Sequence, residues 1–136
     1  MPPSATSRSN ESVQVVVRSR PLNSKEKNEG RLPIVDIDIA TNMISIANPA
    51  ASSTNALETK PFTFDAVYDH TCEQKVFYEE SCYNLVESVL EGFNGTIFAY
   101  GQTGCGKTHT MQGLNEPDEL RGVIPRSFDH IFEAIR

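Results

Sequence analysis

The sequence predicts an α/β fold from three observations. The β-branched run Val13–Val17 is typical of a strand buried on both faces. A second apolar block, Thr96–Tyr100, leads directly into the glycine-rich loop Gly101–Thr108, and helix-compatible residues follow. Strand, loop and helix in this order are typical of an α/β unit. With 136 residues, of which 38% are hydrophobic, the chain is expected to form one domain or part of one.

The first half of the chain reads as strands joined by polar segments. Residues 1–12 are polar and predict a disordered leader. Residues 34–39 alternate apolar and acidic side chains, and 43–47 continue the apolar pattern, which predicts a half-exposed hairpin. Residues 48–59 lack periodicity and predict a mobile loop. Residues 62–64 (Phe-Thr-Phe) predict a further short strand.

One long amphipathic helix is predicted after these strands. Thr71 and Gln74 have the spacing of a capping box at its start, and Gly92 and Gly95 supply its stop. We interpret its apolar stripe as core packing rather than as a groove for a partner. The stripe consists of Val76, Tyr83, Val86, Leu90 and Phe93.

A second helix is predicted at the end of the sequence. Pro125 suits a first helical turn, and apolar residues recur at helical spacing from Phe128 to Ile135. The pattern continues to Arg136 without a capping residue, so the sequence is expected to end inside a helix. A strand as apolar as Thr96–Tyr100 also needs a neighbour on each edge, and few strands are predicted. Both observations indicate part of a larger domain.

Composition excludes several classes of function. A formal net charge of −6 disfavours a nucleic-acid binder, which needs clustered Lys and Arg. The three cysteines lack the spacing of a zinc site or a disulfide framework, and they fit a reducing, cytosolic compartment. No stretch approaches the length of a membrane span or has the apolar core of a signal peptide.

The loop matches the phosphate-binding pattern G-x-x-x-x-G-K-S/T in the required context of a strand before it and a helix after it. Its glycines allow backbone amides to surround phosphate oxygens at a helix N-terminus. Lys107 is predicted to reach the β- and γ-phosphates, and the Thr108 hydroxyl to ligate Mg²⁺. A chance glycine-rich turn is disfavoured by the flanking elements. The predicted binding residues are Gly101, Gln102, Thr103, Gly104, Cys105, Gly106, Lys107 and Thr108.

Such a loop alone does not separate kinases, GTPases, transporters and motors. However, residues 95–111 resemble the nucleotide-binding signature of the kinesin motor domain. Residues 18–23, 62–65 and 121–126 resemble the same family in the same order. The resemblance covers 13–136, and it is nearest to the kinesins of intraflagellar transport. It implies the N-terminal part of a P-loop NTPase motor domain, with a mixed central sheet and flanking helices.

The family resemblance also implies site residues and cofactors. ATP and Mg²⁺ would bind at the loop, with Lys107 and Thr108 acting on the phosphates. Arg18, Arg20 and Pro21 would border the adenine and ribose, and His109 would lie near the base. A solvated charge pair at a strand end is the alternative for the two arginines, and a surface histidine is the alternative for His109.

The resemblance places further parts of the motor downstream of this sequence. The two switch motifs, N-x-x-S-S-R-S-H and D-x-x-G-x-E, do not occur in the 136 residues. Microtubule-binding elements and a dimerising coiled coil would also follow, and the full protein would be an ATPase of the cytoplasm, the cytoskeleton and the cilium. A nucleotide-binding or interaction module without motility is a second hypothesis. A P-loop kinase or GTPase is disfavoured, because about a hundred residues precede the loop.

Overall fold

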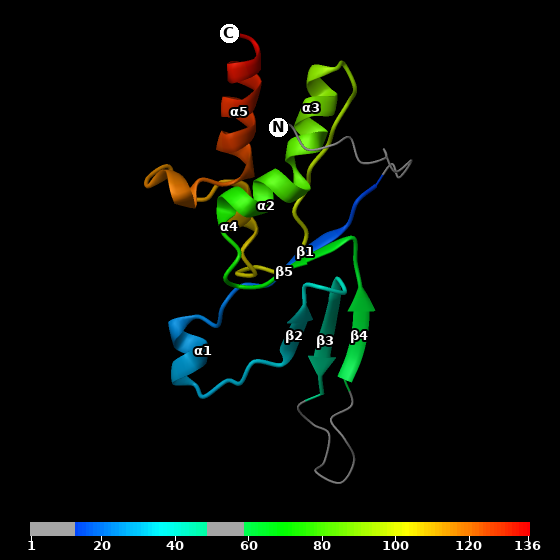
Figure 1. Cartoon of the computed structure of the whole chain (residues 1–136). Coiled ribbons are helices and arrows are strands. Elements are labelled where there is room, and N and C mark those ends of the chain that lie inside the picture. Colours follow the sequence, from blue (N-terminus) through cyan, green and yellow to red (C-terminus); the bar gives the residue numbers. More distant parts are fainter. Residues whose placement is uncertain (1–12, 49–58) are drawn as a thin grey trace.

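A computed structural model describes residues 13–48 and 59–136. In Figure 1 a short sheet of two strands separates a group of helices from a second sheet of three strands. The predicted leader, 1–12, and residues 49–58 of the predicted mobile loop lie outside the described residues. The fold therefore has an α/β character, with most of its helices on one side of the two-stranded sheet.

The two-stranded sheet joins segments far apart in the sequence. Strand β1, Val16–Arg18, pairs in parallel with β5, Ala66–Tyr68. The prediction of a strand from Val13 buried on both faces is wrong, because Val13 is 71% exposed. In the described part of the chain β1 pairs with β5 and with no other strand.

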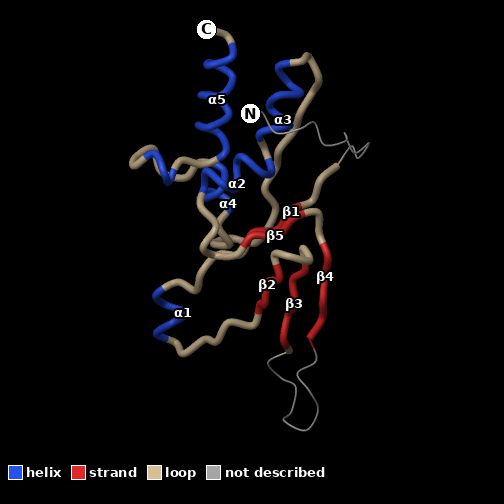
Figure 2. The backbone as a smooth tube through the Cα atoms, viewed as in Figure 1, coloured by secondary structure: helices blue, strands red, loops and turns tan. Residues whose placement is uncertain are grey.

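The three-stranded sheet is antiparallel and confirms the predicted hairpin (Figure 2). Strand β2, Val35–Asp38, pairs with β3, Met43–Ala47, and β3 pairs with β4, Thr59–Thr63. Asn42 has a φ of 54° in the turn between β2 and β3, a conformation that Asn tolerates better than most residues. The predicted third strand is present, but it begins at Thr59 rather than at Phe62.

The long helix predicted after the strands is instead two helices. Helix α2 is Gln74–Ser81 and α3 is Tyr83–Leu90, with a break at Cys82. Only Val86 of the predicted stripe is buried, and Phe93 is 63% exposed. The break changes the helix direction, so that each helix presents its own apolar residues to one core. The predicted stop is confirmed, because Gly92 has a φ of 100° just beyond α3.

The predicted capping box at the start of α2 is wrong. Glu73 is the N-cap residue, and no side chain caps the helix. The amide and the hydroxyl of Thr71 both donate to Asp69 Oδ1, at 2.8 and 2.6 Å. Gln74 is buried at 4% exposure and bonds to other elements instead. A local contact has therefore taken the Thr71 side chain, and tertiary partners have taken that of Gln74.

Three short or terminal elements complete the fold. Helix α1, Ser24–Asn28, has a capping box formed by Asn23 and Glu26. The 3₁₀ helix η1, Asp118–Leu120, precedes α5, Val123–Ala134, and Pro125 lies in the first turn of α5 as predicted. Helix α5 ends at Ala134, and Ile135 after it keeps a right-handed helical conformation.

The core lies where β5, α2, α3 and α5 meet. Tyr68 and Phe77 pack edge to face with 5.0 Å between ring centroids. His130 of α5 contacts α2 and α3: its Nδ1 lies 2.8 Å from Tyr78 Oη and its Nε2 lies 2.6 Å from Glu87 Oε1. The buried residues of this core are Tyr68, Phe77, Tyr78, Cys82, Val86 and Val123. Among the described residues, no helix is long and apolar enough to cross a membrane.

The strand predicted at Thr96–Tyr100 is not formed. This segment has no regular structure, and the side chains of Phe98 and Tyr100 are 82% and 94% exposed. Ile97 alone packs against the core. A strand needs a neighbouring backbone to pair with, and none of the described strands pairs with this segment. The apolar sequence therefore leads into the loop without a sheet around it.

Candidate functional site

The glycine-rich loop Gly101–Thr108 ends in the predicted helix, α4, Lys107–Met111. Gly104 and Gly106 have φ angles of 80° and 105°, which side chains with a Cβ rarely adopt. An added Cβ at Gly104 would meet no atom within 4 Å, so the space beside this residue is open. The loop can adopt this conformation because glycines occupy the positions with positive φ angles.

Lys107 and Thr108 are the first two residues of α4. Lys107 Nζ donates to the carbonyl oxygens of Gly101 and Gln102, at 2.7 and 2.8 Å, so the ammonium group is held within its own loop. The first-turn amides of a helix have no acceptor within it, and here they belong to Lys107, Thr108 and His109. Thr108 is exposed.

These groups fit a phosphate. The loop offers a cation, amides without a helical acceptor and open space beside a left-handed glycine, which together suit an anion with several oxygens. Within residues 13–48 and 59–136, no three His, Cys, Asp or Glu side chains form a metal-binding group. A cation at this loop would therefore depend on phosphate oxygens and on a hydroxyl such as that of Thr108.

Arg20 connects the loop to α1. Its Nε donates to the Gly104 carbonyl at 2.8 Å, and its guanidinium makes two bonds to the Glu26 carboxylate, at 2.8 and 2.6 Å. The guanidinium of Arg20 and the backbone amide of Asn23 lower the pKa of Glu26 to about 2. Arg20 thus lies at the loop, while Pro21 beside it is exposed.

This pair predicts a pH dependence. The folded-state pKa of Glu26 lies below its ordinary value, so its stabilising contribution is complete above pH about 4.5 and is lost as the pH falls towards about 2. The difference in melting temperature between the wild-type protein and Glu26→Gln should shrink across that window. Thermal unfolding at several pH values measures it. In an Arg20→Met background the folded-state pKa of Glu26 should lie closer to its ordinary value, so the loss should be smaller and should end at a higher pH. An unchanged loss there would contradict the pairing.

The side chain of Arg18 has different partners from that of Arg20. Its Nη1 donates to Gln74 Oε1 at 2.6 Å and to Thr110 Oγ1 at 3.3 Å, and its Nη2 donates to the Cys72 carbonyl at 2.7 Å. Its guanidinium carbon is 5.0 Å from the centroid of the Phe77 ring. Burial lowers the pKa of Arg18. The alternative of a solvated charge pair is wrong for this residue, because the side chain is half-buried among α2, α4 and the preceding loop.

His109 is exposed on α4, and its pKa is lowered by partial burial and, secondly, by the charge of Arg18. The structure therefore gathers the loop, Arg20 and His109 in one region, with Arg18 on the core side of α4. The adenine contacts inferred for Arg18, Arg20, Pro21 and His109 stay predictions. Sequence reasoning missed Glu26 and Gln74 as neighbours of the site. The spacing of Asn23 and Glu26 is itself a capping signal that could have located the first.

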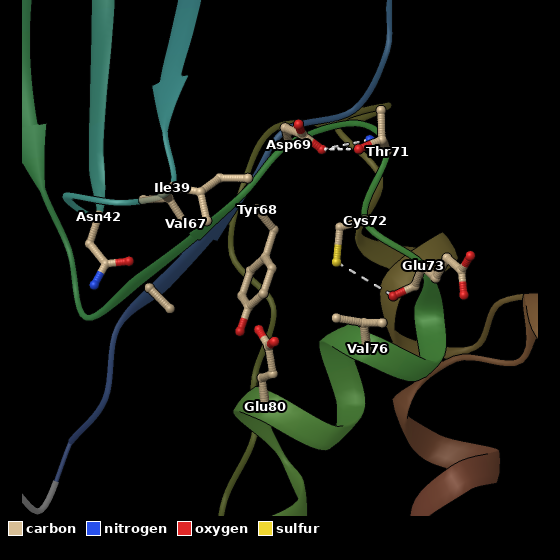
Figure 3. Close-up of a pocket in the computed structure, with 11 residues that line it drawn as sticks. Ile39, Asn42, Val67, Tyr68, Asp69, Thr71, Cys72, Glu73, Val76 and Glu80 are labelled. Carbon is tan, nitrogen blue, oxygen red and sulfur yellow. Dashed lines mark hydrogen bonds between the residues drawn. The ribbon is translucent and has the colours of Figure 1, made fainter.

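A separate groove of about 340 Å³ lies between the β5 strand and α2 (Figure 3). It is lined in part by Ile39, Val67 and Val76, and by the carboxylates of Asp69 and Glu80. None of the predicted site residues lines it. It provides no phosphate-binding geometry, and we assign the candidate site to the glycine-rich loop.

Comparison with known proteins agrees with this site. Residues 18–136 match the family model of the kinesin motor domain. The chain is 48% identical over 128 residues to the kinesin-like protein KIF3C of Mus musculus, covering 94% of this chain and 16% of that protein. It is 47% identical over 123 residues to the kinesin-like protein Klp68D of Drosophila melanogaster, covering 90% of this chain and 15% of that protein. The chain thus spans about a sixth of these relatives.

The matched region includes Arg18 of β1, Arg20 just after this strand, the whole glycine-rich loop and helix α4. The family model therefore matches nearly the whole chain. The chain belongs to the kinesin motor domain family.

Proposed function

We propose that this chain is the ATP-binding part of a microtubule motor that couples ATP hydrolysis to movement along microtubules. The observation that carries the proposal is the loop Gly101–Thr108, with Lys107 and Thr108 at the start of α4. Members of the kinesin family bind nucleotide and are microtubule-stimulated ATPases. The activity of the whole protein is part of the proposal, because the chain spans only about 16% of its relatives.

ATP and Mg²⁺ are the proposed cofactors. Lys107 would leave its carbonyl partners in the loop and donate to the β- and γ-phosphates, while the first-turn amides of α4 bind phosphate oxygens. The Thr108 hydroxyl would ligate Mg²⁺, and this cation would neutralise charge on the phosphates. The catalytic assignment in this chain is therefore to Lys107 and Thr108, which act by positioning and charge stabilisation.

The base would lie beside Arg20, Pro21 and His109. Arg20 Nε already bonds to the Gly104 carbonyl, which supports a position next to the nucleotide. Arg18 is the weaker candidate for a direct contact, since its guanidinium is engaged by Gln74, Thr110 and the Cys72 carbonyl. We propose that Arg18 serves the site through these contacts.

Microtubules are the proposed partner, and association with the cytoskeleton in the cytoplasm follows from family membership. The dimeric state through a coiled coil and the ciliary location are finer proposals, which rest on the resemblance to the kinesins of intraflagellar transport.

Co-sedimentation of the full-length protein with microtubules tests the proposed function. Binding should be strong with a non-hydrolysable ATP analogue and weak with ADP, and microtubules should stimulate ATP turnover. In the Lys107→Ala variant, prepared in parallel, microtubule binding should no longer depend on the nucleotide. Nucleotide-independent binding by the wild-type protein, without ATP turnover, would refute the proposal and favour a non-motile interaction module.

A further inference from the structure

Gln74 is the polar side chain that is most deeply buried in the described part of the chain, with 4% of its surface exposed. It is the first residue of α2, and it bonds to three other elements. Its Nε2 donates to the His109 carbonyl of α4 at 2.6 Å and to the Leu120 carbonyl of η1 at 3.3 Å. Its Oε1 accepts from Arg18 Nη1 of β1 at 2.6 Å. A buried amide is stable only when its donors and acceptor are bonded, and here all are.

The His109 carbonyl needs such a donor. The last carbonyls of a helix receive no hydrogen bond from an amide within the helix, and α4 has only five residues. The amide of Gln112 caps the carbonyl of Thr108 at 2.8 Å, which leaves the next carbonyl, that of His109, to a donor from outside the helix. Gln74 supplies this donor from α2, so that it closes the end of the helix that follows the glycine-rich loop.

Arg18 fixes the orientation of the Gln74 amide. A guanidinium is a donor only, so it must face the oxygen of the carboxamide, and this turns the amide nitrogen towards the carbonyl of His109. Arg18 also donates to Thr110 Oγ1 at 3.3 Å. Two consecutive residues of α4 are thus held by side chains of α2 and β1. The helix cannot rotate or slide along its axis without breaking one of these part-buried hydrogen bonds.

The loop residues of the site lie at the other end of this short helix. Lys107 and Thr108 precede His109 directly, so a shift of the anchored carbonyl displaces both of them. A misplacement of about 1 Å in a binding constellation is enough to lower activity by about a hundredfold. We propose that Gln74 is a positioning residue of the nucleotide site, which holds the loop helix in register by its bond to the His109 carbonyl. This inference rests on the proposed function.

The test compares Gln74→Met with Lys75→Met in the full-length protein. Both variants place the same side chain on α2, but Lys75 is 65% exposed. KM for ATP is measured with Mg²⁺ and microtubules, at a temperature well below the melting point of each variant. Gln74→Met should raise KM about tenfold, which equals about 1.4 kcal/mol, and Lys75→Met should leave it unchanged. A residue with a purely structural role would lower the melting temperature without changing KM in the folded protein.

Gln74→Glu separates the acceptor bond of the amide from its two donor bonds. The carboxylate keeps the acceptor for Arg18 but loses the donor to the His109 carbonyl, so its KM should rise as in Gln74→Met. If Gln74→Met does not fold, Gln74→Glu decides alone. A wild-type KM in Gln74→Glu, or in a folded Gln74→Met, would overturn the positioning role and leave the proposed function intact. A wild-type protein that fails to bind ATP would overturn both.

Discussion

Lys107→Ala should lower ATP turnover of the full-length motor by at least about 100-fold, since removing one preorganised donor from a charged transition state has an effect of this size. Its ammonium group lies within the loop, 2.7 Å from the Gly101 carbonyl and 2.8 Å from that of Gln102. No other side chain of the loop carries a positive charge. Steady-state turnover with saturating ATP and microtubules measures the effect.

Two further variants sharpen this prediction. Lys60→Ala makes the same change on β4, in the sheet away from the loop, and should turn over ATP like the wild-type protein. Thr108→Asn removes the hydroxyl proposed for Mg²⁺ and should raise the Mg²⁺ concentration needed for half-maximal turnover. Near-normal microtubule-stimulated turnover in Lys107→Ala would contradict the assignment of the loop as the phosphate site.

Gly113→Ala should destabilise the protein more than any exposed substitution. Gly113 has a φ of 64°, and a Cβ there would lie 2.0 Å from the Leu120 carbonyl oxygen. The two backbones meet at this point, since Leu114 donates to the Leu120 carbonyl and Gly122 donates to the Gln112 carbonyl, both at 2.9 Å. Left-handed strain and the clash together should lower the stability by about 3 kcal/mol. The shift in thermal unfolding temperature measures it.

Gly30→Ala is the matched control. Gly30 has a similar φ of 70°, but an added Cβ there meets nothing within 4 Å. This variant carries the backbone strain alone and should cost about 1 kcal/mol. Equal shifts for the two variants would show that the contact between the segments after α4 and before α5 is not tight. A larger shift for Gly113→Ala supports the close backbone approach.

Local patterns predicted the elements whose determinants are close in sequence. The hairpin of β2 and β3 follows from alternation of side chains, and the stop at Gly92 follows from the left-handed conformation that glycine adopts readily. The loop and α4 also follow from local sequence, because their glycines, lysine and threonine have to stand at fixed spacing. In each case the interactions that form the element span only a few residues.

The errors occur where the outcome depends on distant partners. Thr96–Tyr100 has the composition of a strand, but strand formation requires a second backbone, and no described strand pairs with it. Helix α2 stops at Ser81, and the next residue, Cys82, lies in the core at 3% exposure, which helical periodicity does not reveal. The capping box failed because Gln74 gains more from three buried hydrogen bonds than from one local cap.

The sequence by itself determined the chemistry of the site. A phosphate-binding loop needs glycines, a lysine and a hydroxyl in fixed order along the chain, and Gly101–Thr108 supplies them. Only the tertiary structure decided the roles of Arg18 in β1 and of Arg20 just after this strand. Arg20 reaches the Gly104 carbonyl, while Arg18, two residues earlier, points to Gln74. Strand alternation would place residues i and i+2 on the same face, so it does not predict this difference. The chain leaves β1 after Arg18, and the packing of α1, α2 and α4 sets the partners of each arginine.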